Sequence, residues 1–251
     1  MKKTLFGAQP SGKLHLGNYI GTIRPALMLG GETVCLIANY HAMTSGAVSD
    51  SVIQLLETQL RALGVKNIMR QKEEALLLMW KFMCGTTVMK LTQEPQYKSK
   101  EGKTAGLLCY PLLMCADIIS ANCDAVLVGE DQTTHIELYR DICRKLGKDP
   151  IETIIIQKRV MSCVDPGKKM SKSLGENHCI FLFDTKDYYL KKLAQHPTHD
   201  TGLKNLRLLC EDFGAPFDEN NMKATKEELA ERIYNEVGDY KFNHDYYDTI
   251  K

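Results

Sequence analysis

Short apolar runs alternate with longer segments of helical periodicity along most of the chain. The runs are four to six residues long and rich in β-branched side chains, which is typical of buried strands. Because a helical segment follows most of them, the pattern predicts an α/β protein with a mainly parallel sheet. Strands are expected over residues 4–8, 34–39, 67–70, 125–128 and 153–156.

Two of the intervening segments show a clear helical period. Apolar side chains recur every three or four positions over 51–63 and again between Asp131 and Gly147. This spacing places them on one helix face, and a glycine stands where each helix would end. Residues 92–104 are polar and interrupted by a proline, so the sequence predicts a loop there.

The strand signals end near Asp184, and only helical patterns follow. Three further helices are expected, over 185–195, 202–213 and 225–237. Thr225 and Glu228 have the spacing of a capping box at the start of the last helix. The sequence therefore predicts a sheet-containing domain over 1–184 and a small helical region over 185–251.

The composition is that of an ordinary folded protein, with 44% apolar and 25% charged residues. Lys and Arg number 32 against 31 Asp and Glu, and no part has the positive charge of a general nucleic-acid-binding surface. The nine cysteines are odd in number and form no C-x-x-C pair, so neither a zinc site nor a disulfide framework is expected. No apolar window approaches the ~20 residues that span a bilayer. A reducing cytoplasm is the expected location.

Residues 7–21 (GAQPSGKLHLGNYIG) begin at the end of the first expected strand and run into a helix. A glycine-rich turn there directs backbone N–H groups at an anion, so phosphate is the natural ligand. The segment contains neither a dinucleotide fingerprint nor a Walker loop. His15 and Asn18 are three positions apart, so they share a helix face on which both can donate hydrogen bonds. Taken alone, a histidine such as His15 is more often a surface residue at a helix start than a catalytic one.

Residues 165–175 (DPGKKMSKSLG) alternate lysines with serines between two glycines. Lysine donors on a loop that can close would neutralise a triphosphate and the charge that develops during displacement at phosphorus. In isolation, the segment is better explained as a basic surface turn.

Taken together, H-L-G-N (15–18) and K-M-S-K-S (169–173) resemble the paired nucleotide signatures of class I aminoacyl-tRNA synthetases. Further strings resemble the bacterial-type tryptophanyl-tRNA synthetases of that class: QPSGKLHLGNYIGTIRPA, YHAMT, YPLLMCADI, VGEDQTTHIELYRDI and RVMS. The resemblance implies a Rossmann-like doubly wound parallel sheet, with ATP at the carboxyl ends of the strands. Asn18 stands where many members have histidine, and Asn39 stands where an acidic residue is usual. The C-terminal region is shorter than in typical members.

The resemblance also implies roles for individual residues. The catalytic hydrogen-bond donors would be His15, Asn18, Lys169 and Lys172. Contacts to ATP are expected from Gln9, Pro10, Ser11, Gly17, Asn18, Gly129, Glu130, Asp131, Val160, Lys169, Met170, Ser171, Lys172 and Ser173. Contacts to tryptophan are expected from Gln9, Tyr110, Met114, Asp117, Ile118, Val126, Val128 and Gln132. No residue is expected to bind a metal directly.

Asp117 is the acidic residue of the apolar run 107–119. A buried carboxylate needs a partner, and by the resemblance that partner is the indole N–H, which can only donate. A salt bridge inside the helix would satisfy the carboxylate equally well. His135 and Glu137 are expected on a helix surface and are assigned no chemistry.

The implied reaction is the ATP-dependent activation of L-tryptophan, with Mg²⁺, followed by transfer to tRNA(Trp), in a homodimer. Two alternatives stay open: a tyrosyl-tRNA synthetase-like enzyme, and a truncated relative that binds tryptophan or its adenylate without charging tRNA. Tyrosyl relatives share the fold and the lysine motif but lack Y-P-x-L-M-x-A-D-I, which favours tryptophan.

Overall fold

The computed structural model describes residues 2–99 and 102–239, which belong to two compact units. The sheet unit comprises residues 1–12, 26–57 and 65–157, and the helical unit comprises 13–25, 58–64 and 158–251. The domain boundary expected after residue 184 stays a prediction. The packing groups residues 158–184 with the helices that follow them.

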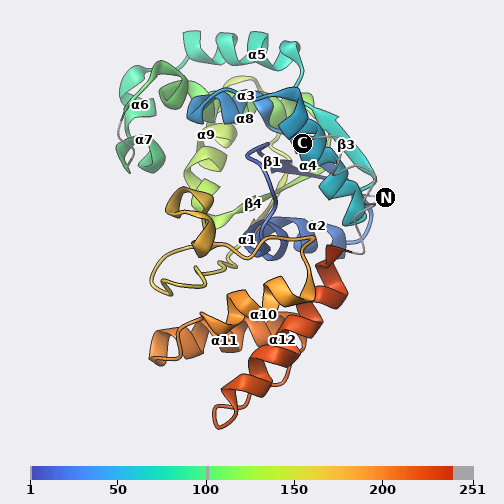
Figure 1. The fold of residues 1–251 in the computed structure, drawn as a ribbon. Coiled ribbons are helices and arrows are strands. Elements are labelled where there is room, and N and C mark those ends of the chain that lie inside the picture. Colours follow the sequence, from blue (N-terminus) through green and yellow to red (C-terminus); the bar gives the residue numbers. More distant parts are fainter. Residues whose placement is uncertain (1, 100–101, 240–251) are drawn as a thin grey trace. The chain divides into compact units, whose positions relative to one another are not determined.

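Five parallel strands form the sheet (Figure 1). Their order is β3-β2-β1-β4-β5. They are β1 (Lys3–Ala8), β2 (Glu32–Ile37), β3 (Asn67–Arg70), β4 (Ala125–Gly129) and β5 (Glu152–Ile156). All five expected strands are present, and the α/β Rossmann-like class is confirmed. The strand order reverses beside β1, so the carboxyl ends of β1 and β4 form the switch point at which such sheets bind ligands.

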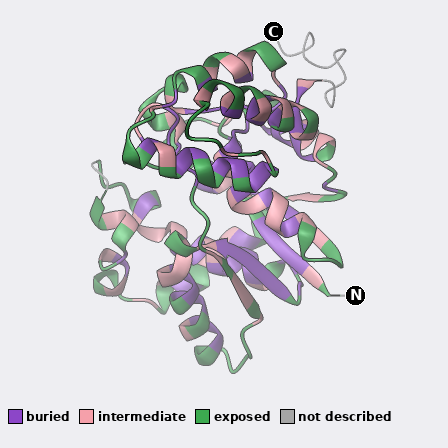
Figure 2. Cartoon of the chain, turned by 90° about the horizontal axis from the view of Figure 1, so that it is seen from below, coloured by how far each residue is buried: buried purple, intermediate pink, exposed green. Residues whose placement is uncertain are grey.

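Both faces of the sheet are buried along the central strands β1, β2 and β4, as is usual for parallel strands (Figure 2). Leu5, Val34 and Val126 point to one face, where they join a core with Leu112 and Ala116. The alternate strand residues, such as Phe6 and Leu127, are also buried. This explains why the strands read as continuous apolar runs instead of alternating ones.

These α-helices lie entirely within the sheet unit: α3 (Asn39–Ala42), α5 (Glu73–Cys84), α6 (Val88–Thr92), α7 (Pro95–Ser99), α8 (Ala105–Ser120) and α9 (Thr133–Lys145). Residues of α2 (Arg24–Met28) and α4 (Asp50–Ala62) are divided between the two units. The loop expected over 92–104 is partly wrong, because α7 lies within it. Pro95 is its first residue, where the missing N–H of proline removes no helical hydrogen bond.

The helical unit contains α1 (Leu16–Asn18), the π-helix η1 (Tyr19–Ile23), α10 (Lys186–Ala194), α11 (Asp200–Phe213) and α12 (Met222–Val237). α10 and α11 both pack against α12 (Figure 1). The three expected helices are therefore present, but the expected capping box at Thr225 is wrong. The side chain of Asn221 caps α12, because the hydroxyl of Thr225 is bonded to Asp218 in the preceding turn.

No helix in the described part of the chain is both long and apolar enough to cross a membrane.

Candidate active site

His15 and Asn18 form a reciprocal cap at the start of α1. The Gly17 N–H donates to His15 Nδ1 at 3.1 Å, and the His15 N–H donates to Asn18 Oδ1 at 3.1 Å. A neutral imidazole whose Nδ1 accepts carries its proton on Nε2, so His15 keeps one donor for a ligand. The Asn18 amide nitrogen is likewise a donor. A Cβ at position 17 would lie 2.9 Å from the imidazole, which explains the glycine.

Burial keeps His15 neutral. Only 5% of the residue is exposed, and desolvation, with the nearby charges of Lys172 and Lys169, lowers the pKa of His15 to about 4. Burial also lowers the pKa of Lys172. Both side chains therefore present N–H donors in a region of positive potential, which suits a polyphosphate ligand.

The lysine segment folds back on the residues just before it. The Met170 N–H donates to the Val160 carbonyl at 2.9 Å, and the Ser162 N–H donates to the Lys168 carbonyl at 2.8 Å. Ser171 then caps a short 3₁₀ helix, η4 (Lys172–Leu174), through a bond from the Ser173 N–H. The backbone of the segment is thus ordered by its own hydrogen bonds.

Two contacts hold the lysine segment beside the first signature. The Lys172 ammonium donates to the Lys13 carbonyl at 3.1 Å, and the buried Met170 side chain lies 3.6 Å from where a Gly17 Cβ would be. The helical unit therefore brings together His15, Gly17, Met170 and Lys172. Lys168 instead pairs with Asp165 at 3.0 Å.

Ser162, the last residue of RVMS, anchors the base of the lysine segment. Its buried hydroxyl accepts from the N–H groups of Val164 at 3.2 Å and Asp165 at 3.1 Å, and lies 2.9 Å from His178 Nδ1. With two donors already directed at its oxygen, the hydroxyl donates its proton to His178. Although Ser162 belongs to the RVMS string, the sequence alone assigned it no role.

In the sheet unit, Asp117 lies on α8 and is 6% exposed. Its Oδ2 accepts from His41 Nε2 at 2.9 Å and from Gln71 Nε2 at 2.7 Å. The Gln71 amide is oriented by the Tyr40 N–H, which donates to its Oε1 at 2.7 Å. Both partners therefore come from outside α8, and no salt bridge inside the helix forms. Among the described residues, none donates to the other carboxylate oxygen, Oδ1.

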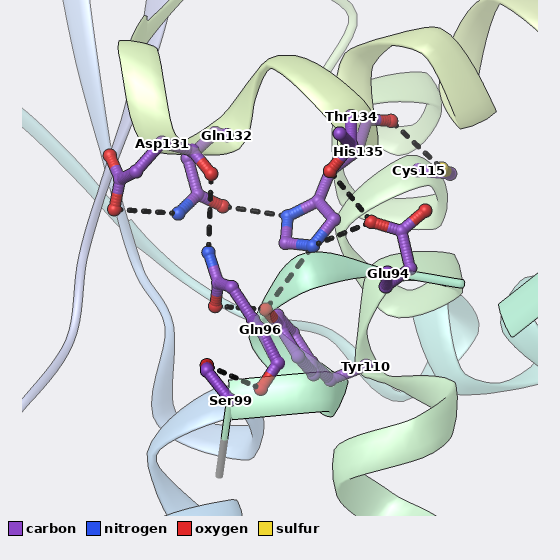
Figure 3. A network of polar contacts seen from close by, with 9 residues as sticks. All are labelled: Glu94, Gln96, Ser99, Tyr110, Cys115, Asp131, Gln132, Thr134 and His135. Atoms are coloured by element: carbon purple, nitrogen blue, oxygen red, sulfur yellow. Dashed lines mark hydrogen bonds and ion pairs between the residues drawn. The ribbon is translucent and has the colours of Figure 1, made fainter. Parts of the chain in front are cut away.

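Tyr110 and Gln132 converge on a buried histidine (Figure 3). His135 Nδ1 lies 2.8 Å from Gln132 Oε1, and His135 Nε2 lies 3.2 Å from the Tyr110 hydroxyl. The same hydroxyl donates to Gln96 Oε1. The expectation that His135 is a surface residue is wrong, because the residue is fully buried. Glu137 is exposed, as expected.

Aromatic packing connects the surroundings of Tyr110 with those of Asp117. The Tyr110 ring meets His41 edge to face at a centroid distance of 5.8 Å and meets His135 at 5.1 Å. The other side chains expected around tryptophan belong to or border the hydrophobic core: Ile118, Val126 and Val128 are buried, and Met114 is half-buried. Gln9 is exposed after β1.

The residues of the sheet unit expected at ATP follow two neighbouring strands. Gln9, Pro10 and Ser11 come after β1, with Pro10 buried and the other two exposed. Gly129 ends β4, and Glu130 and Asp131 open the 3₁₀ helix η3 (Glu130–Gln132). A Cβ on Gly129 would lie 2.6 Å from the Asp131 carboxylate, so a larger residue there would require the exposed Asp131 side chain to move. No group of three or more metal-ligating side chains occurs in the described residues.

Comparison with known proteins identifies the family. The family described as tRNA synthetases class I (W and Y) matches residues 2–241. The chain belongs to this family. Among curated relatives, the tryptophan–tRNA ligase of Wolinella succinogenes is 35% identical over 81% of this chain and 70% of its own length. The Listeria monocytogenes tryptophan–tRNA ligase is 37% identical over 81% and 69%.

A solved structure of this synthetase family has the same fold. The tryptophanyl-tRNA synthetase of Campylobacter jejuni, determined with ADP and tryptophan, superposes with a TM-score of 0.77 and 27% identity. The superposition covers 99% of this chain and 89% of that one.

Several residues of this synthetase site carried no signal in the sequence. Gln71 and Glu94 lie just beyond a strand and a short helix, where no periodic pattern marks them. His41 stood in a quoted string, but its bond to Asp117 crosses 76 residues. Asn39, which departs from the family pattern, has a buried Oδ1 with no partner among the described residues.

Proposed function

We propose that this chain activates L-tryptophan with ATP and transfers it to tRNA(Trp), the activity of a tryptophan–tRNA ligase. The observation that carries the proposal is Asp117, a buried carboxylate with two donors on one oxygen. The other oxygen accepts the indole N–H of the substrate. Relatives that bear this enzyme name at 35% and 37% identity support the same conclusion.

The remaining contacts to tryptophan follow from the surroundings of Asp117. Tyr110, Gln9 and Gln132 hold the amino and carboxyl ends of the substrate. We assign the amino end to Tyr110 and Gln132, because a buried carboxylate, Glu94, lies beside the histidine that both contact. The indole ring packs on Met114, Ile118, Val126 and Val128. Because the site is built around a required hydrogen bond, an amino acid without the matching donor is rejected by about 10⁴-fold or more.

The reaction needs positioning and charge stabilisation rather than a protein nucleophile. The tryptophan carboxylate attacks the α-phosphorus of ATP, pyrophosphate leaves, and the adenylate then reacts with the terminal ribose of the tRNA. His15, Asn18, Lys169 and Lys172 donate to the phosphate oxygens as charge develops there. Their bonds strengthen in the transition state, so they lower the barrier to activation.

The nucleotide is held by backbone and side-chain groups of the two signatures, of the segments that follow β1 and β4, and of Val160. The proposed contacts are Gln9, Pro10, Ser11, Gly17, Asn18, Gly129, Glu130, Asp131, Val160, Lys169, Met170, Ser171, Lys172 and Ser173. Mg²⁺ supplies charge neutralisation of the polyphosphate when it is bound. Because the lysines repel a free cation, the site fits ATP to which Mg²⁺ is already bound.

We also propose a homodimer. The sheet unit exposes large apolar side chains on α5 and α6: Leu77, Trp80, Val88 and Met89 are 62–74% exposed. A second copy of the chain would cover them. Trp80→Glu should then convert a dimer into a monomer, as measured by light scattering on a sizing column. A monomer in the unmodified protein would refute the dimer.

Pyrophosphate exchange driven by an added amino acid tests the main proposal. Exchange with tryptophan and not with tyrosine is the expected result. Exchange with tyrosine would identify a tyrosyl enzyme, and no exchange with either would identify a binding protein. Aminoacylation of tRNA, measured in parallel, separates an activating enzyme from one that also charges tRNA. We expect the reaction to take place in the cytoplasm, where ATP and tRNA meet.

A further inference from the structure

A buried carboxylate lies beside His135, near the residues assigned to the amino end of the substrate (Figure 3). Glu94 joins α6 to α7 and is 7% exposed. Its Oε2 accepts from the Thr134 hydroxyl at 2.7 Å and lies 3.3 Å from His135 Nε2. Burying a carboxylate costs several kcal/mol unless its charge is used. Nothing in the proposed reaction so far uses it.

The protons around His135 can be assigned from the geometry. The Gln132 amide nitrogen donates to Asp131 Oδ2 at 3.3 Å, which directs Gln132 Oε1 toward His135 Nδ1. Nδ1 must therefore carry a proton and donate. Nε2 of the neutral ring is then an acceptor, and it faces the Tyr110 hydroxyl at 3.2 Å. His135 thereby orients both Tyr110 and Gln132.

The cluster has more acceptors than donors. The Gln96 nitrogen donates to the Asp131 carbonyl at 3.3 Å, so Gln96 Oε1 also faces the Tyr110 hydroxyl. The one Tyr110 proton is shared by two acceptors, and the Glu94 carboxylate adds a negative charge beside them. An ammonium group has three donors and a positive charge. It would supply what the cluster lacks.

We propose that Glu94 and His135 are positioning residues for the α-ammonium of the amino acid substrate. His135 orients Tyr110 and Gln132 so that their oxygen atoms can accept from the ammonium group. Glu94, which lies beside His135 Nε2, supplies the negative charge. The inference rests on the proposed function, because it takes the amino end of tryptophan to bind at Tyr110 and Gln132.

The test compares two ligands that differ only in the amino group. Tryptophan and indole-3-propionate are titrated calorimetrically into the full-length protein and into its Glu94→Gln variant, whose side chain has the same shape without the charge. The tryptophan Kd should rise about tenfold, which is about 1.4 kcal/mol. The Kd of indole-3-propionate should not change. An equal rise for both ligands, or no rise for either, overturns the inference.

Thr134→Val is the matched control. It removes a hydrogen bond to the same carboxylate and keeps the charge, so the ratio of the two dissociation constants should stay as in the unmodified protein. If Thr134→Val weakens tryptophan relative to indole-3-propionate as much as Glu94→Gln does, the orientation of the carboxylate and not its charge is responsible. That result would overturn the role of Glu94.

A second variant covers the case in which Glu94→Gln does not fold. His135→Asn keeps a donor toward Gln132 and loses the acceptor for Tyr110, so it should weaken tryptophan and spare indole-3-propionate. Failure of the proposed function would be recognised separately, because the unmodified protein would then show no tryptophan-dependent pyrophosphate exchange.

Discussion

The tautomer of His15 decides what this side chain can do for a phosphate. Its Nδ1 is occupied by the Gly17 N–H, so only Nε2–H is left to donate. The cap and the donor are therefore on different nitrogens. They can be separated by substitution.

We expect His15→Asn to keep the cap and lose the donor, because the asparagine oxygen occupies the place of Nδ1. Activation should fall by about 10² to 10³, the usual cost of one transition-state donor, with little change in tryptophan affinity or in the thermal midpoint. Pyrophosphate exchange and calorimetry measure these quantities. His15→Gln is the comparison: it restores a donor near Nε2, loses the cap, and should lower the thermal midpoint instead. A normal exchange rate in His15→Asn would remove His15 from the mechanism.

Gln71 is expected to determine the specificity for the indole N–H through Asp117. Removing its amide in Gln71→Ala leaves Oδ2 with only His41 and frees the carboxylate to rotate. The KM for tryptophan should rise about tenfold, which is about 1.4 kcal/mol, because a carboxylate that is no longer fixed by Gln71 is less well oriented toward the indole N–H. An analogue with sulfur in place of the indole N–H should be affected much less. If the KM rises equally for tryptophan and for the sulfur analogue, Gln71 supports the fold and does not determine specificity.

The sequence predicted the burial of Asp117 but not its partners. The apolar run around Asp117 was enough to indicate a buried carboxylate. His41 and Gln71 are 76 and 46 residues away, and they reach it because β2, which leads into α3, and β3 end at the same edge of the sheet. Pairing of that kind depends on tertiary structure, which no local pattern contains. His135 was misassigned for the same reason.

At the scale of elements, the helix after the first signature is tied to the end of the helical unit. The Tyr19 hydroxyl in η1 donates to Glu236 of α12 at 2.8 Å, and Arg24 lies 3.5 Å from the same carboxylate. The Arg24 guanidinium also donates to the Asp212 carbonyl at 2.6 Å and stacks over Phe213. A π-helix is an irregular element, and these contacts explain how it is maintained.

Tyr19→Phe should therefore destabilise the protein by about 0.5–1.5 kcal/mol, the net contribution of a typical hydrogen bond, because the half-buried Glu236 loses one donor but keeps Arg24. Urea unfolding measures the change. Arg232→Ala is the control, since Arg232 forms an exposed pair with Glu228 within α12 and should cost under about 0.5 kcal/mol. Equal midpoints for the two variants would show that Tyr19 does not anchor η1.

Elements with a strong period were predictable, whereas the short ones and the longer helix α5 were not. The five strands and helices α4, α9, α10, α11 and α12 follow from apolar spacing. The π-helix and α7 have too few residues to show a period, and α7 depends on Pro95 and on the Glu94 carbonyl that accepts from Tyr97 and Lys98. The start of α12 was misplaced because Asn221 competes with Thr225 for the cap.

For the whole molecule, the two units each contain a histidine that burial keeps neutral. The pKa values of His15 and His135 are both lowered from 6.5 to about 4, with desolvation as the first cause. In the unfolded chain both imidazoles bind protons near pH 6.5. The unfolded state therefore binds more protons than the folded state between about pH 6.5 and 4.

The free energy of unfolding should consequently be fully retained above about pH 7.5 and fall as the pH decreases toward 4. With two groups, the loss between about pH 7.5 and 5.5 is about 3 kcal/mol. Urea midpoints at the two pH values measure it, and His135→Gln should reduce the dependence. Added salt separates this effect from surface pairs such as Lys168 with Asp165, because screening weakens exposed pairs but not the desolvation of a buried ring. Midpoints that do not change over this range would mean that neither imidazole is held neutral by burial, and the donor assigned to His15 would then have to be a protonated ring.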